Sequence, residues 1–250
     1  MVHRILIVTA VAAEADSVSA GLALGGPGLL PLPGGLALRR HNGPDDGGPL
    51  VDVLVGGVGP AAVAASTGTA LAHASLTSPG SPYDLVVSAG IAGGFQPLAP
   101  LGSVVVSTSV VAADLGAETP DGYLTVEELG FGRSAHPVPD ALTGRIAAAL
   151  DAGGLPHTAA PVLTVSTVTG TAGRAAELAE RHPGAAAEAM EGFGVAEAAA
   201  AYGVPVVEIR AVSNAVGPRD RAAWRIGEAL GALRHTFELL SRTVFLEPSP

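Results

Sequence analysis

The chain has 250 residues, of which 48% are hydrophobic, and it carries a formal net charge of −10. No apolar stretch reaches transmembrane length, and the acidic balance opposes binding to nucleic acid or to an anionic membrane surface. Cysteine is absent, which excludes disulfides, thiolate metal sites and cysteine nucleophiles. The length suits one large domain, 1–250, and the short apolar run near the start is not a signal-peptide core, so we expect a cytoplasmic protein.

Short apolar runs and alanine-rich stretches alternate along the chain. The runs predict buried strands at residues 5–8, 50–55, 85–87, 104–111, 162–165 and 204–212. The alanine-rich stretches predict helices at 60–75, 139–152, 174–181 and 192–202. Clusters of Gly, Pro and Asp predict loops at 24–48, 77–82 and 119–136. The alternation predicts an α/β fold with a central mixed sheet and flanking helices.

Glu14 follows the first predicted strand by six residues. Ligands of open α/β sheets bind beyond the carboxyl ends of the strands, so Glu14 is a candidate for the wall of a binding site. The alternative is a solvated acid in the first turn of a helix, where the helix dipole stabilises it.

Glycine-rich runs follow two of the predicted strands, at residues 56–59 and 88–94. Glycine lets backbone amides approach a ligand closely, but a tight structural turn explains each run equally well. Neither run has the spacing of a dinucleotide-binding fingerprint or a P-loop, so we expect no cofactor.

Further along the chain, polar residues stand where apolar segments end. Glu191 lies before glycines and an alanine-rich helix, which suits either a helix N-terminal acid or a ligand contact. Ser213 and Asn214 end the last predicted strand, at the edge where sites are built. No Gly-x-Ser-x-Gly elbow and no metal-ligand spacing are present, so we expect neither a serine nucleophile nor a metal.

Taken in chain order, Glu14, the glycines at 90–94, the Met190-Glu191 pair and the strand end at 209–214 resemble the nucleoside phosphorylase and nucleosidase family. The likeness covers nearly the whole chain and is greatest in the nucleosidase branch. It implies a single α/β domain whose mixed sheet closes partly into a barrel. It also implies a small-molecule purine nucleoside substrate and a homo-oligomer.

The resemblance implies cleavage of an N-glycosidic bond. Glu14 would be the general base that takes a proton from water, Glu191 would accept hydrogen bonds from two ribose hydroxyls, and Met190 would pack against the sugar. A carboxylate near the sugar opposes the positive charge of an oxocarbenium-like transition state. Ser213 would orient Asn214 or contact the base, with a hydroxyl that only ends the strand as the alternative. The backbone around four residues would line the sugar and base: Ala92, Gly93, Gly170 and Thr171.

Asn214 departs from the family pattern, because the adenosine-specific members have an aspartate there. An amide offers one donor and one acceptor, which match the keto oxygen and a protonated N7 of a 6-oxopurine. A carboxylate would set two acceptors against each other. The departure predicts a preference for inosine-like over adenosine-like substrates.

Residues 113–122 and 214–221 carry a narrower resemblance, to family members whose 6-oxopurine nucleosides bear a carboxylate on the 5′ side. A cation should meet that carboxylate. Four residues are candidates, with solvated surface charge as the alternative for each: Arg133, His136, Arg219 and Arg221. Trp224 and Phe193 are candidate site aromatics, although helix packing is the commoner use.

Several alternatives stay open. Methylthioadenosine, S-adenosylhomocysteine and inosine are alternative substrates, and a phosphorylase would attack the same bond with phosphate. Residues 9–14 and 88–94 contain no Arg or Lys, and Glu14 would repel phosphate, which favours hydrolysis. A catalytically silent purine-binding module is possible on the same fold, but a neutral nucleoside does not demand both Glu14 and Glu191.

Overall fold

The computed structural model describes residues 4–43, 48–79 and 82–246. Its strands are β1 (Arg4–Thr9), β2 (Gly28–Pro31), β3 (Ala37–Asn42), β4 (Leu50–Val55), β5 (Leu85–Gly94), β6 (Val104–Ala112), β7 (Gly116–Thr119), β8 (Gly122–Thr125), β9 (Ala135–Pro137), β10 (His157–Thr164), β11 (Ala187–Ala189) and β12 (Val206–Ala215). Its helices are α1 (Ala12–Gly21), α2 (Pro60–Thr77), α3 (Asp140–Ala152), α4 (Ala172–Arg181), α5 (Gly192–Ala201) and α6 (Ile226–Ser241).

The main sheet is mixed and partly closed. Its strands follow the order β11-β10-β6-β12-β5-β1-β4-β3-β2, and β11 also pairs with β5. This extra pairing closes β5, β12, β6, β10 and β11 into a barrel, while the strands from β1 to β2 extend it as an open sheet. β12 is parallel to β5 and antiparallel to β6. The predicted mixed sheet with partial barrel closure is confirmed.

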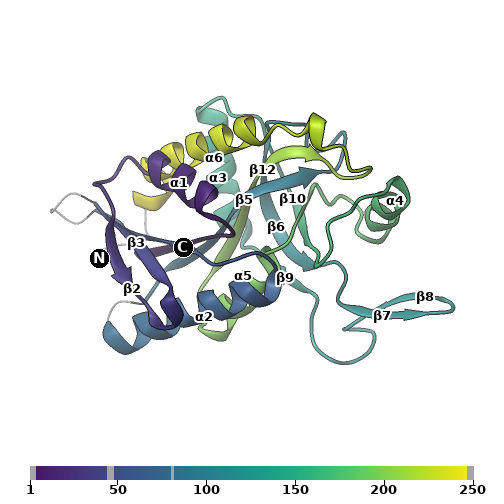
Figure 1. Cartoon of the computed structure of the whole chain (residues 1–250), viewed down its shortest axis with the longest axis horizontal. Coiled ribbons are helices and arrows are strands. Elements are labelled where there is room, and N and C mark those ends of the chain that lie inside the picture. The colour runs from purple at the N-terminus through teal and green to yellow at the C-terminus, as the bar shows by residue number, and fades with distance from the viewer. Residues whose placement is uncertain (1–3, 44–47, 80–81, 247–250) are drawn as a thin grey trace.

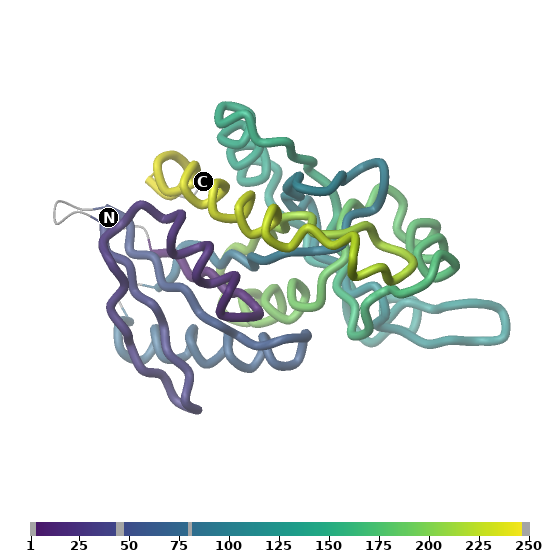
Figure 2. Tube along the Cα trace, turned by 45° about the horizontal axis from the view of Figure 1, so that its top comes forward, coloured from purple at the N-terminus to yellow at the C-terminus, as the bar shows by residue number. Residues whose placement is uncertain are grey.

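The helices cover the sheet on two sides (Figure 1). α1, α3 and α6 lie on one side, and α2 and α5 lie on the other. α4 and the β7–β8 hairpin lie at the end of the molecule away from β2 and β3 (Figures 1 and 2). No helix in the described ranges is long and apolar enough to cross a membrane.

All the predicted strands and helices occur, the strand at 50–55 with its predicted bounds and the others with shifted ends, but the predicted loops are partly wrong. The loop expected at 24–48 contains β2 and β3, with residues 44–47 outside the described part of the chain. The loop expected at 119–136 contains β8 and β9. In both segments Gly and Pro lie at the strand ends and turns, so the composition predicts loops. The short strands between these residues are stabilised by pairing within the sheet. Residues 80–81 of the loop expected at 77–82 are also outside the described ranges.

The glycine run at 88–94, expected as a loop, is the second half of β5. Its glycines are required by close neighbours. A Cβ on Gly90 would lie 2.5 Å from Glu14 Oε1 and 2.6 Å from Arg210 Nη1, and a Cβ on Gly94 would lie 2.6 Å from Val212 Cγ1. Side chains on both sides therefore pack directly against the β5 backbone, which positions the candidate site.

Candidate functional site

The site lies at the edge where three parallel strands end. β1 pairs in parallel with β5, and β5 pairs in parallel with β12, so their carboxyl ends meet on one side of the sheet. Glu14 follows β1 in the first turn of α1, Gly90 to Gly93 belong to β5, and Asn214 lies near the end of β12. The topology thus brings together residues that are about 200 positions apart, as expected for a site in an open α/β sheet.

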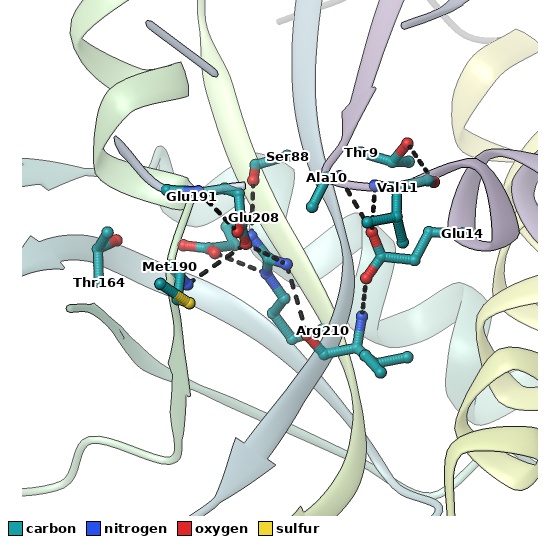
Figure 3. Close-up of polar contacts among 12 residues, drawn as sticks. Thr9, Ala10, Val11, Glu14, Ser88, Thr164, Met190, Glu191, Glu208 and Arg210 are labelled. Atoms are coloured by element: carbon teal, nitrogen blue, oxygen red, sulfur yellow. Dashed lines mark hydrogen bonds and ion pairs between the residues drawn. The ribbon is translucent and has the colours of Figure 1, made fainter. Parts of the chain in front are cut away.

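Glu14 is buried and its carboxylate is held by backbone amides (Figure 3). Oε2 accepts from Ala10 N at 3.0 Å and from Val11 N at 3.2 Å, and Oε1 accepts from Ile91 N at 2.9 Å. A carboxylate offers about four lone-pair directions, so Oε1 can still accept one further hydrogen bond. The solvated-acid alternative is excluded by this burial.

Glu191 and Glu208 share one buried arginine, Arg210 (Figure 3), and Arg210 lies against Gly90. Arg210 Nε donates to Glu208 Oε1 at 2.7 Å, and Arg210 Nη1 lies 3.2 Å from Glu191 Oε2. Arg210 Nη2 also donates to the Ser88 hydroxyl at 3.1 Å. We call Glu14, Glu191, Glu208 and Arg210 the acidic cluster, since it holds three carboxylates and one guanidinium.

Backbone amides complete the environment of Glu191, which stands just before α5. Gly59 N donates to Glu191 Oε1 and Met190 N donates to Oε2, both at 3.3 Å. Gly59 has a φ of 91°, a left-handed conformation that favours glycine. The glycine run at 56–59 is therefore both a turn and a contact of the site.

The electrostatics of the acidic cluster follow from its burial. Removal from water raises the pKa of the Glu208 carboxyl above its usual value, even though Arg210 acts in the opposite direction. Burial alone would lower the pKa of Arg210, but the charges of Glu208, Glu191 and Glu14 raise it above its ordinary value. Arg210 therefore stays charged, and its charge is already shared between two carboxylates.

Asn214 is half-buried and is oriented by its neighbours. The Ser213 hydroxyl lies 2.9 Å from Asn214 Oδ1 and 3.2 Å from Ala92 O, and Asn214 Nδ2 donates to Ala215 O at 3.0 Å. Gly93 is the register partner of Asn214 across β5 and β12. The predicted residues Ala92, Gly93, Ser213 and Asn214 are thus brought together, with Ser213 in contact with Asn214.

Gly170 and Thr171 lie on the segment between β10 and α4, where both are exposed. Thr171 is the N-cap of α4 and accepts from Arg174 N, and Gly170 O accepts from Arg219 N at 3.3 Å. The structure therefore places these two residues beside the loop that follows β12, and not in contact with the acidic cluster.

The segment before Gly170 is fixed by a buried acid that the sequence did not single out. Glu188, on β11, accepts from Thr169 N at 2.8 Å and from the Thr169 hydroxyl. Burial raises the pKa of Glu188, against the effect of these hydrogen bonds. Glu188 thereby ties the 166–171 segment to the barrel.

The candidate cations divide into two pairs. His136 Nε2 lies 2.5 Å from Glu197 Oε1, and Arg133 Nε lies 3.9 Å from the same oxygen, so both face a carboxylate already. Arg219 and Arg221 instead approach the ring of Trp224, at 5.2 and 5.7 Å from its centroid. Phe193, a candidate site aromatic, is buried and packs against the His136 ring at 5.3 Å between centroids.

Sequence reasoning missed Arg210 and Glu208, and this changes one argument. Residues 9–14 and 88–94 contain no cation, but β12 brings Arg210 to Gly90 from elsewhere in the chain. The signal in the sequence was the opposite charges of Glu208 and Arg210 within an apolar strand. Their i, i+2 spacing places both side chains on one face of the strand. Hydrolysis is still favoured over phosphorolysis, because Arg210 is paired with Glu208 and Glu191 and is not free to neutralise phosphate.

Among the described residues, no group of three or more His, Asp or Glu side chains could hold a metal ion. The acidic cluster can instead activate a neutral nucleophile, oppose a developing positive charge and accept hydrogen bonds from hydroxyls. A partly closed mixed sheet with buried carboxylates at the carboxyl ends of its strands is what the sequence resemblance implies for an enzyme of the nucleoside-cleaving class.

Comparisons with known proteins agree with that class. Residues 4–243 match the model of the Phosphorylase superfamily, and the chain belongs to this family. It is 60% identical, over 92% of each chain, to a protein of Streptomyces coelicolor named futalosine hydrolase. A futalosine hydrolase of Acidothermus cellulolyticus is 46% identical over 94% of this chain and 89% of its own.

A solved structure shows the same fold at low sequence identity. The native futalosine hydrolase of Helicobacter pylori superposes with a TM-score of 0.78, covers 97% of this chain and 99% of its own, and is 16% identical. The fold is thus shared across sequences that have diverged almost completely.

Proposed function

We propose that this chain hydrolyses the N-glycosidic bond of futalosine and releases hypoxanthine. The choice of substrate is supported by the 60% identity, over 92% of each chain, to a protein named futalosine hydrolase. The reaction class is supported independently by the acidic cluster, in which Glu14 and Glu191 are buried on either side of Gly90 and Arg210.

In this proposal Glu14 is the general base. Three backbone amides fix its carboxylate, and the remaining acceptor direction of Oε1 would receive a hydrogen from the attacking water. The same carboxylate occupies the Ile91 and Val11 amides that could otherwise bind an anion, so phosphate would meet a negative charge where those donors stand. Water is therefore the nucleophile.

Glu191 would accept hydrogen bonds from the ribose hydroxyls while Met190 packs against the sugar. As the glycosidic bond breaks, positive charge develops on the ribose and is opposed by the excess of carboxylate over guanidinium in the acidic cluster. Arg210 fixes the Glu191 carboxylate at 3.2 Å, so little reorganisation is needed when this charge appears.

Asn214 would recognise the base through its amide. One Nδ2 hydrogen is given to Ala215 O, and the other remains to donate to the keto oxygen of a 6-oxopurine. Oδ1 accepts from the Ser213 hydroxyl and keeps a second lone pair for a protonated N7. Ala92, Gly93, Gly170 and Thr171 would line the sugar and base.

A product assay tests the proposal. Hypoxanthine or adenine release is measured from futalosine, inosine, methylthioadenosine and adenosine, with and without phosphate. We expect futalosine to be cleaved with the highest kcat/KM, and its rate not to depend on phosphate. Formation of a sugar 1-phosphate would instead establish a phosphorylase, and binding without cleavage would establish a purine-binding module. The expected homo-oligomer is tested separately by light scattering.

A further inference from the structure

We propose that the loop after β12 forms a subsite for an aromatic carboxylate, in which Arg219, Arg221 and Trp224 bind the benzoate on the 5′ side of futalosine. This inference rests on the proposed function and names the residues that would select the acidic arm of the substrate. We call residues 214–225 the rim loop.

Both ends of the rim loop are fixed beside the site. Its first residue, Asn214, is in register with Gly93, and Val216 also contacts this glycine, because a Cβ on Gly93 would lie 3.0 Å from Val216 Cγ2. At the other end, Arg225 N donates to Ser213 O at 2.7 Å, so the last residue of the rim loop binds the residue directly before its first one. The rim loop is therefore a closed excursion that begins and ends at the proposed base-binding residues.

The middle of the rim loop lies against the segment before α4. Arg219 N donates to Gly170 O at 3.3 Å, and Figure 2 shows the chain before α6 passing close to the segment around α4. The Thr169–Glu188 hydrogen bonds in turn fix that segment to the barrel. Arg219 is thus held by its backbone next to Gly170, while its side chain is exposed.

The two guanidinium groups have the chemistry that an aromatic carboxylate requires. Arg219 and Arg221 are exposed and flank the half-buried Trp224 at 5.2 and 5.7 Å from the ring centroid. Within the described ranges, no carboxylate pairs with either of them, whereas the neighbouring Arg225 pairs with Glu228. Asp220 lies between the two arginines in sequence, but its Oδ1 caps the Arg221–Ala223 turn by accepting from Ala222 N.

In a chain with a net charge of −10, Arg219 and Arg221 lie at one aromatic ring and have no carboxylate partner among the described residues. Stacking on Trp224 restricts both guanidinium groups before any ligand arrives, which reduces the entropy lost when they bind a carboxylate. The planar guanidinium can also stack on a benzoate ring, and its forked donors match the two carboxylate oxygens. A neutral 5′ group would gain little from these residues.

The test compares futalosine with its methyl ester, which keeps the ring and removes the charge. In the wild-type protein we expect kcat/KM to be higher for futalosine. The Arg219→Ala and Arg221→Ala variants should each lower kcat/KM for futalosine by roughly tenfold and leave the ester within about twofold, as charge-assisted hydrogen bonds are lost. Arg234→Ala is the matched control: it removes the same charge from an exposed position on α6 and should change neither substrate.

Binding is measured without turnover through Trp224, the only tryptophan of the chain. In a Glu14→Gln background, futalosine should change the fluorescence of Trp224, and the Arg219→Ala/Arg221→Ala pair should abolish that change. If wild type cleaves futalosine but the arginine variants affect acid and ester equally, the subsite is wrong and the proposed function stands. If wild type does not cleave futalosine, the proposed function fails, and the fluorescence change alone supports or overturns the subsite.

Discussion

The acidic cluster and the rim loop face the same site but are built in opposite ways. The charged groups of the acidic cluster are buried, and each carboxylate there accepts from a backbone amide or from Arg210. In the rim loop, the backbone is fixed at Ser213 and Gly170, whereas Arg219 and Arg221 extend into solvent without a carboxylate partner in the described structure.

Under the proposed function, this difference separates the residues that carry out the reaction from the residues that select the substrate. A buried charge that loses its partner carries a large desolvation penalty, so the acidic cluster tolerates little change and suits chemistry common to many nucleosides. An exposed side chain can be replaced at small energetic cost, so the rim loop can vary with the substrate's base and 5′ group. Changes in the acidic cluster should therefore affect all substrates, and changes in the rim loop should affect some of them.

The largest effect is expected for Glu14→Gln. The amide removes the proposed base and places an NH₂ group against backbone N–H donors, so kcat/KM should fall by about 10²- to 10⁴-fold for every substrate. Hypoxanthine release from futalosine and its methyl ester measures this loss. The control is Asp16→Asn on the same helix, where the side chain is 67% exposed and pairs with Arg39. A Glu14→Gln protein with the wild-type rate would remove Glu14 from the mechanism.

A second change tests whether Glu191 contacts the ribose. Glu191→Gln should lower kcat/KM for futalosine by roughly 10²-fold, because a charged hydrogen bond and a stabilising negative charge are lost together. The 2′-deoxy analogue separates these effects: it should be a poor substrate for wild type relative to futalosine, but not for the variant. Because the ratio of the two substrates is compared between wild type and variant, the intrinsic reactivity of the deoxy sugar cancels. Equal discrimination by both proteins would place the ribose hydroxyls elsewhere.

The contrast also explains how much the sequence could predict. Strand and helix periodicity locates the sheet, and the expected carboxyl ends of its strands place Glu14 and Asn214 on one edge from the sequence alone. The order of motifs in the family resemblance supplied the partial barrel, which periodicity cannot show, because the closing pairing of β11 with β5 joins segments far apart in the chain.

The missed residues are those whose role depends on non-local contacts. Arg210 and Glu208 looked like part of a strand, since only the fold shows that Gly90 leaves room for the guanidinium. The four candidate cations could not be ranked from sequence, because the pairing of Arg133 and His136 with Glu197 arises between separate elements. The role of Glu188 could not be predicted for the same reason, because its hydrogen bonds to Thr169 join two separate segments.

A smaller and substrate-dependent effect is expected for Asn214→Asp, at the start of the rim loop. The carboxylate would face Ala215 O with an acceptor and could no longer donate to a keto oxygen. The ratio of kcat/KM for futalosine over its 6-amino analogue should fall by about 10- to 100-fold. Base release from both nucleosides measures the ratio. An unchanged ratio with both rates lowered would show that Asn214 supports the fold of the site without reading the base.

The smallest effect concerns Glu188, which ties the segment beside the rim loop to the barrel. Because burial raises the pKa of Glu188 in the folded state, its contribution to stability is fully present below the unfolded pKa and is lost as pH rises through the folded value. Glu188→Gln keeps an acceptor for Thr169 N and a donor for the Thr169 hydroxyl while removing the charge. The variant should therefore gain stability relative to wild type between pH 5 and pH 8.

Urea unfolding at the two pH values measures that gain, which we expect to be on the order of 1 kcal/mol, the size of one buried hydrogen bond. Glu208 and the other acids titrate in both proteins, so their contributions cancel in the difference. Glu180→Gln, at an exposed position on α4, removes the same charge without burial and should show no such trend. If the stability of Glu188→Gln relative to wild type falls as pH rises, the ionised carboxylate, and not its protonated form, holds the segment beside the rim loop.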